Sequence, residues 1–228
     1  MFVKICGITQ VDQGVAIARA FQRYGMAGRC GLGFISVLAS KRYVAPEQAA
    51  AIVEAVPPGV ETIGVFAGET CDRVVEIAAQ TALSGVQLHG NESPDYCRSL
   101  RRALPHIRLI KALRLRQQDD LAQLEAYGDE VDTYLIDAYH PQQLGGTGIA
   151  ADWSLLKGFR PLLPWMLAGG LTPENVRQAI ATAVPDGIDL SSGVERQPGL
   201  KDLDRVEQLL SVVQAVERSV EPNRDRSG

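Results

Sequence analysis

The sequence predicts an α/β protein folded as a single (β/α)8 TIM barrel. Short apolar runs, rich in β-branched residues, alternate along the chain with segments of helical periodicity. Strands that alternate with helices pair in parallel through crossover connections. Eight such runs occur in the 228 residues, and a TIM barrel needs about 200 residues or more.

The predicted strands begin at the second residue and recur at regular intervals. They are residues Phe2–Cys6, 33–37, 62–66, 86–89, 108–113, Thr133–Asp137, Trp165–Ala168 and Gly187–Leu190. The predicted helices between and after them include residues 46–56, 71–81, 93–104, 119–127, 173–183 and 203–216. One helix start is marked by Thr172 as N-cap and Pro173 in the first turn. Residues 24–31 contain three glycines and predict a loop before the second strand.

No linker interrupts this pattern, so we expect residues 1–220 to form one catalytic barrel domain. Residues 221–228 are polar and predict a flexible C-terminal tail. The alternative architecture is an open, doubly wound sheet. That fold usually carries a glycine-rich dinucleotide turn after an early strand, whereas the first strand here runs into Cys6-Gly7-Ile8-Thr9.

Composition narrows the class of protein and its partners. A net charge of −4 and a pI near 5.5 argue against nucleic acid or a membrane surface as partner. No apolar run is long enough for a transmembrane helix, and no secretory signal precedes the first strand. The four cysteines form no CxxC pair and the histidines are scattered, so no zinc site is expected. Free thiols of this kind predict a cytoplasmic protein.

Polar residues gather where the predicted strands end, which is the active-site face of a TIM barrel. They are Cys6, Lys41, Arg42, Gln87, His89, Asp137 and Asp189. Cys6 could be a small buried filler and Asp137 a loop cap. Because their strands lie on different sides of the barrel mouth, they could instead exchange protons with a ligand between them. Arg42 is either a carboxylate-binding residue or a solvated cation, and His89 is more simply a hydrogen-bonding residue.

Glycine-rich loops follow the last three predicted strands. They contain Gly145-Gly146-Thr147-Gly148, Gly169-Gly170 and Ser191-Ser192-Gly193. Glycines can merely turn the chain, but barrels often bind phosphate with the loops after strands seven and eight. Backbone N–H groups and serine hydroxyls in such loops suit an anion. The three loops together therefore predict a phosphate site.

A set of motifs spread over nearly the whole chain resembles one family. The motifs include Lys4-Ile5-Cys6-Gly7-Ile8-Thr9, Ser40-Lys41-Arg42-Tyr43, Gln87-Leu88-His89-Gly90, Leu135-Ile136-Asp137, Gly145-Gly146-Thr147-Gly148, Ala168-Gly169-Gly170, Asp189-Leu190-Ser191-Ser192-Gly193-Val194-Glu195 and Pro198-Gly199-Leu200-Lys201-Asp202. In order and spacing they resemble the phosphoribosylanthranilate isomerases of tryptophan biosynthesis. The resemblance departs at residues 24–31, a longer connection, which we expect to affect stability more than activity because it lies on the face opposite the site.

The resemblance implies a cofactor-free and metal-free Amadori rearrangement of N-(5′-phosphoribosyl)anthranilate to 1-(2-carboxyphenylamino)-1-deoxyribulose 5-phosphate. It implies Cys6 as general base and Asp137 as general acid, with Arg42 on the anthranilate carboxylate. The further substrate contacts expected are Lys4, Gln87, His89 and Asp189, and the phosphate contacts are Gly146, Gly169, Gly170, Ser191, Ser192 and Gly193. The only expected partner is the small-molecule substrate, with the protein a monomer or homodimer.

Two other functions compete with this one. Related sugar-phosphate isomerases of histidine biosynthesis resemble the chain at the phosphate loops but carry an aspartate where Cys6 stands. A non-catalytic barrel that binds a phosphorylated ligand would not need both Cys6 and Asp137. For catalysis we expect a lowered pKa of Cys6, with Lys4 on the same face of the strand as one source of positive potential.

Overall fold

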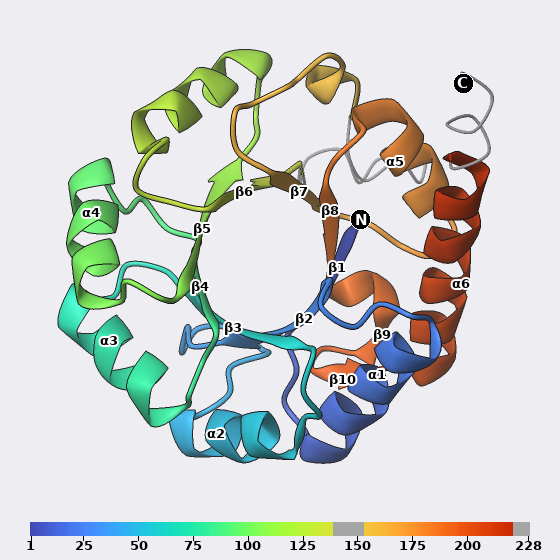
Figure 1. Ribbon diagram of the computed structural model, residues 1–228, viewed down its shortest axis with the longest axis horizontal. Helices are drawn as coiled ribbons and strands as arrows, with labels where there is room; N and C mark the ends of the chain where they lie inside the picture. Colours follow the sequence, from blue (N-terminus) through green and yellow to red (C-terminus); the bar gives the residue numbers. More distant parts are fainter. Residues whose placement is uncertain (139–152, 221–228) are drawn as a thin grey trace, which may run out of the picture.

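Eight parallel strands close into a barrel in the computed structural model, which describes residues 1–138 and 153–220 (Figure 1). The strands are β1 (Phe2–Cys6), β2 (Cys30–Ile35), β3 (Glu61–Phe66), β4 (Gly85–Leu88), β5 (Arg108–Arg114), β6 (Thr133–Asp137), β7 (Trp165–Ala168) and β8 (Gly187–Leu190). Each pairs with its neighbours in sequence, and β8 closes the ring against β1. The predicted TIM barrel is confirmed.

Helices surround the barrel and cover its outer surface (Figure 1). They are α1 (Val11–Arg23), α2 (Pro46–Ala55), α3 (Cys71–Gln80), α4 (Pro94–Ala103), α5 (Val176–Ala183) and α6 (Leu203–Val220), with 3-10 helices η1 (Gln118–Tyr127), η3 (Trp153–Leu156) and η4 (Ser192–Val194). A short antiparallel pair, β9 (Glu195–Gln197) and β10 (Leu200–Lys201), lies between β8 and α6. The loop around Gly146 and the tail 221–228 lie outside the described residues.

Two helix predictions need correction. The segment predicted as a helix at 119–127 is the 3-10 helix η1, in which only Asp120 and Leu124 are buried. A segment with so small a buried stripe gains little from forming a full α-helix. Helix α5 begins at Val176 rather than at 173. The Thr172 N–H donates to Asn175 Oδ1 at 2.8 Å, and the Asn175 N–H donates to Thr172 Oγ1 at 3.3 Å. These two bonds close a turn that ends at Asn175, before the helix begins.

The predicted start of the second strand is also wrong. Cys30 and Gly31, expected in a loop, belong to β2, which ends at Ile35. The glycines here allow close packing rather than a turn: a Cβ on Gly31 would lie 3.1 Å from the side chain of Ile63. A Cβ on Gly33 would lie 2.6 Å from the sulfur of Cys6. Gly33 therefore leaves room for the Cys6 side chain inside the barrel.

The lower half of the barrel interior is apolar. A cluster of inward-facing side chains fills it, with Phe2 packed beneath: Ile63, Ile110, Ala112, Leu135, Met166 and Ala168. The Arg108 guanidinium lies 4.6 Å from the centre of the Phe2 ring and pairs with Glu61 at 2.9 Å. A second, larger core packs the outer side of the strands against the helices. With this floor filled, a ligand can enter the barrel only from the carboxyl ends of the strands.

Candidate active site

A cavity of about 350 Å³ opens at the carboxyl ends of the strands. Its walls include most of the residues singled out from the sequence: Cys6, Arg42, Gln87, His89, Asp137, Gly169, Gly170, Asp189, Ser191 and Ser192. Lys4 contacts two of these residues, and Gly193 lies in the loop after β8. The predicted phosphate loop Gly145-Gly146-Thr147-Gly148, with the expected contact Gly146, lies outside the described part of the chain.

Lys4 is completely buried and connects two walls of the barrel. Its ammonium donates hydrogen bonds to Gln87 Oε1 at 2.8 Å and to Asp189 Oδ2 at 3.0 Å. Burial disfavours the charged amine, but the negative charges of Asp189 and of the Cys6 thiolate outweigh it and raise the pKa of Lys4. Lys4 therefore stays protonated and supplies a fixed positive charge beside Cys6.

Cys6 ends β1 and is buried at the cavity wall. Burial raises the pKa of the Cys6 thiol, and Asp189 raises it further, while Lys4 and Lys201 lower it. The net shift is upward, so the lowered pKa expected from the sequence is wrong for the site without ligand. The physical reason is that removing a thiolate from water costs more than the two lysines recover. The charges of both lysines nevertheless favour the thiolate form.

Asp137, at the end of β6, faces His89 across the cavity. His89 Nε2 lies 3.5 Å from Asp137 Oδ2, and His89 Nδ1 lies 3.0 Å from the amide nitrogen of Gln87. Because Lys4 donates to Gln87 Oε1, the amide must present its N–H to His89. A neutral His89 then accepts at Nδ1 and carries its proton on Nε2, toward Asp137. His89 thus forms a side-chain hydrogen bond with Gln87, and its contact with substrate stays a prediction.

The loops after β7 and β8 approach each other closely. Gly169 and Gly170 have φ values of 95° and 64°, in the left-handed region that favours glycine. A Cβ on Gly193 would lie 1.9 Å from the carbonyl oxygen of Leu171, so the two loops pack backbone against backbone. Among the described residues, Ser191 Oγ and Asp189 Oδ1 are buried without a hydrogen-bond partner. Since such atoms usually find a partner, both indicate a polar ligand in the cavity.

Arg42 is held by a residue that the sequence analysis did not single out. Its guanidinium forms a bidentate pair with Glu195, with contacts of 2.6 to 3.1 Å. Lys201 Nζ donates to the same carboxylate at 2.7 Å. Both partners were part of the recognised motifs, but no local pattern shows that the β9–β10 pair brings them to Arg42. Their roles follow only from contacts between residues far apart in the chain.

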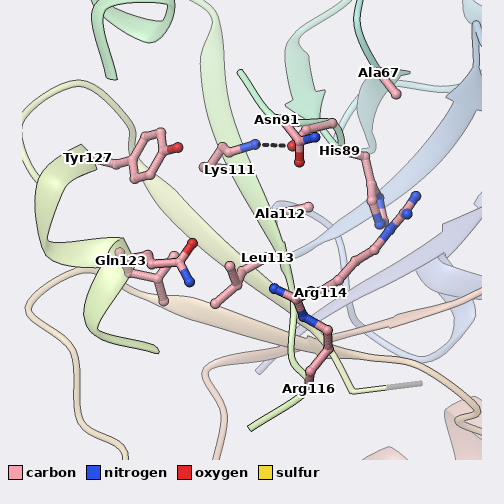
Figure 2. A pocket seen from close by; sticks show the side chains of 12 residues that line it. Ala67, His89, Asn91, Lys111, Ala112, Leu113, Arg114, Arg116, Gln123 and Tyr127 are labelled. Carbon is pink, nitrogen blue, oxygen red and sulfur yellow. Dashed lines mark hydrogen bonds between the residues drawn. The ribbon is translucent and has the colours of Figure 1, made fainter. Parts of the chain in front are cut away.

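A second pocket, of about 550 Å³, lies beside the mouth and shares His89 with the first (Figure 2). Lys111 lines it and pairs with the buried Glu92 at 2.8 Å. Arg114, at the end of β5, is the register partner of Asp137 and also lines this pocket. Since Glu92 neutralises Lys111, Arg114 supplies the positive charge on the approach to the acid side of the cavity.

Within residues 1–138 and 153–220, no three His, Cys, Asp or Glu side chains are grouped as metal ligands. In the same residues no helix has the length and apolar character to span a membrane. The closed barrel and the polar cavity at its carboxyl end define a (β/α)8-barrel enzyme. Comparison with known proteins gives the particular family. Residues 3–212 match the family described as N-(5′-phosphoribosyl)anthranilate isomerase, and the chain belongs to this family of isomerases.

Relatives at high identity carry the same description. An N-(5′-phosphoribosyl)anthranilate isomerase of Rippkaea orientalis is 51% identical over 214 residues, covering 94% of this chain and 96% of the relative. The solved phosphoribosylanthranilate isomerase of Thermotoga maritima is 35% identical with a TM-score of 0.82, covering 94% of this chain and 99% of that one. A further isomerase structure, in complex with reduced 1-(o-carboxyphenylamino)-1-deoxyribulose 5-phosphate, is 33% identical with a TM-score of 0.80, covering 94% and 99%. A third describes monomers of the dimeric Thermotoga maritima enzyme, at 32% identity, a TM-score of 0.78, and 94% and 98% coverage.

Proposed function

We propose that this chain converts N-(5′-phosphoribosyl)anthranilate into 1-(2-carboxyphenylamino)-1-deoxyribulose 5-phosphate, the third step of tryptophan biosynthesis from chorismate. The observation that carries the assignment of roles is that Cys6 and Asp137 line the same cavity as the glycine loops after β7 and β8. An acid and a base on two sides of one cavity of about 350 Å³ suit an isomerisation by proton transfer. The reaction adds and removes no atoms overall, so it needs no co-substrate.

In this proposal Asp137 first donates a proton to the furanose ring oxygen. The bond between C1 and that oxygen breaks, and the nitrogen lone pair forms the protonated Schiff base. The Cys6 thiolate then removes the proton from C2, and the electron pair left behind forms an enolamine. Tautomerisation of the enolamine gives the ketone. His89, with its Nε2 proton toward Asp137, stabilises the Asp137 carboxylate after it has given up its proton.

The remaining residues hold the two ends of the substrate. The phosphate lies between the loops of Gly169-Gly170 and Ser191-Ser192-Gly193, whereas Gly146, also expected there from the sequence, lies outside the described residues. The unpartnered Ser191 Oγ supports this placement. Asp189 Oδ1 accepts from a substrate hydroxyl, and Lys4 and Gln87 form the polar floor. Arg42 binds the anthranilate carboxylate with the N–H groups that do not donate to Glu195.

A steady-state assay of the purified chain tests this proposal. Loss of phosphoribosylanthranilate fluorescence with saturation kinetics supports it, and binding without turnover would instead support a non-catalytic barrel. Substantial turnover of the histidine-pathway aminoaldose would overturn the substrate assignment. Arg42→Ala should raise KM by at least about 10-fold with a smaller change in kcat, because a charge-assisted bidentate contact contributes about 1.5–3 kcal/mol.

We further propose a cytoplasmic enzyme whose catalytic domain spans residues 1–220, acting as a monomer or homodimer. The dimeric relative from Thermotoga maritima supports the homodimer. Sedimentation velocity at assay concentration distinguishes the two states.

A further inference from the structure

Lys201 is a buried cation that no step of the proposed reaction uses. It ends β10 and has a relative exposure of 2%. Its backbone N–H donates to Gln13 Oε1 at 3.0 Å, and its carbonyl accepts from Gln13 Nε2 at 3.2 Å. Gln13 of α1 therefore holds the Lys201 backbone from both sides. A residue anchored in this way presents its ammonium at a defined place.

The Lys201 ammonium contacts three separate elements of the site. It donates to the backbone oxygen of Cys6 at 2.5 Å, to the backbone oxygen of Ser191 at 3.3 Å and to Glu195 Oε1 at 2.7 Å. Cys6 ends β1, and Ser191 begins the loop after β8. One side chain thus joins the strand that carries the thiol to the loop that we assign to the phosphate.

Glu195 extends this connection to Arg42. Its carboxylate, with a side-chain exposure of 4%, accepts from Lys201, from Arg42 and from the Gly199 N–H at 3.2 Å. The order of charges is positive, negative, positive, from Lys201 through Glu195 to Arg42. Gly7 leaves room for this arrangement, since a Cβ there would lie 2.7 Å from Arg42 Cδ. Arg42 is consequently oriented by Glu195, and Glu195 by Lys201.

We infer that Lys201 is a positioning residue for the isomerase reaction: it fixes the end of β1 against the loop after β8 and, through Glu195, orients Arg42. The inference rests on the proposed roles of Cys6 and Arg42. The charge of Lys201 has a second effect, because it lowers the pKa of the Cys6 thiol against the effect of burial. Replacing the ammonium with an apolar side chain would remove the Lys201 donor from the Cys6 and Ser191 backbone oxygens and from Glu195. Ser191 would keep only the Val194 N–H at 3.3 Å, and Glu195 would keep Arg42 and the Gly199 N–H.

The test compares Lys201→Met with Glu195→Gln, which remove opposite charges from the same cluster. Both are made in a Cys71→Ser background, because Cys71 is the partly exposed thiol of the described chain. The rate of Cys6 alkylation by iodoacetamide is measured against pH, with the alkylated residue identified by mass spectrometry. Lys201→Met should raise the pH midpoint by about one unit, and Glu195→Gln should lower it or leave it unchanged. A purely structural loosening would move both midpoints in the same direction.

Steady-state kinetics give the second readout. Lys201→Met should lower kcat/KM at least about 10-fold, and Glu195→Gln should act mainly on KM, because it releases Arg42. Lys157→Met, at an exposed lysine away from the cavity, is the matched control and should leave both readouts unchanged. A folded Lys201→Met protein with an alkylation midpoint and kcat/KM close to the parent's would overturn the inference. If Lys201→Met does not fold, an unchanged KM in Glu195→Gln overturns it instead.

Failure of the proposed reaction is recognised separately. Alkylation is measured without turnover, so the effect of Lys201 on the thiol can be seen even if the substrate assignment is wrong. Full activity of Cys6→Ser would remove the proposed base, whatever the two cluster variants show.

Discussion

His89 Nε2 lies 3.5 Å from Asp137 Oδ2, while its other ring nitrogen contacts the Gln87 amide at 3.0 Å. Lys4 holds the oxygen of that same amide at 2.8 Å. The orientation of the imidazole beside the proposed acid is thus determined by a lysine beside the proposed base. The two halves of the cavity are connected through one glutamine side chain.

This connection predicts the effect of changing Gln87. Gln87→Leu should lower kcat by about 10-fold and alter KM less, because the variant loses the orientation of His89 but keeps Asp137 and the Arg42 side of the site. Gln87→Glu is the informative second variant, because glutamate has nearly the same size as glutamine and its carboxylate can still accept the hydrogen bond from Lys4. Steady-state kinetics measure both. Equal kcat for the parent and Gln87→Leu would contradict a role for this orientation.

Alkaline pH should destabilise the folded protein through its buried thiols. Burial raises the pKa of Cys30 to about 12 and that of Cys97 to about 11, and it raises the pKa of Cys6 as well. The unfolded chain releases these protons from about pH 8.5 upward, whereas the folded chain retains them. Between these limits the native state binds more protons, so the free energy of unfolding falls as pH rises.

Urea unfolding at several pH values between 7 and 11 checks this prediction. Cys97→Ser, which removes one buried thiol, should flatten the decline even if it lowers stability at pH 7. Cys71→Ser is the matched comparison: Cys71 is only partly buried, and although burial raises the pKa of its thiol too, its removal should flatten the decline less. If the free energy of unfolding of Cys97→Ser fell with pH as steeply as that of the parent, the Cys97 thiol would be excluded as a cause of the alkaline destabilisation.

The long connection before β2 should affect stability more than catalysis. Its residue Arg29 pairs with Glu217 of α6, and the N-terminal amine pairs with the same carboxylate at 2.8 Å. Glu217→Gln should lower the free energy of unfolding by roughly 1 kcal/mol, a modest amount because Arg29 is partly exposed. The lowered pKa of Glu217 means that this contribution is present above the unfolded pKa of about 4.3 and is lost as pH falls further. Urea unfolding at pH 7 and pH 3 measures this contribution, and kcat is measured at pH 7. A reduced kcat in Glu217→Gln would contradict the prediction that this end of the barrel acts on stability and not on the active site.

The barrel itself could be predicted because strand and helix periodicities are local properties of the chain. The start of β2 could not, because a glycine suits both a turn and a close approach between strands. Only the position of Ile63 beside Gly31 decides between them. The 3-10 character of η1 likewise depends on how little of it the fold buries.

The same distinction holds for the site. In a barrel, polar residues at strand ends must face one cavity, so their convergence follows from the sequence pattern. The contacts of Glu195 and Lys201 with Arg42 and Cys6 join residues more than 150 positions apart, and no local pattern encodes them. The direction of the Cys6 pKa shift also depends on burial, which outweighs the positive charges that the sequence suggested.

We assign the proton transfers of the isomerisation to Cys6 and Asp137. The most direct measurement is steady-state turnover of phosphoribosylanthranilate by the parent chain, Cys6→Ser and Asp137→Asn, with Cys71→Ser as control. Each of the first two variants should lower kcat by at least about 100-fold, with the folded state verified by circular dichroism and the control unchanged. Near-parental kcat in either variant would remove that residue from the mechanism.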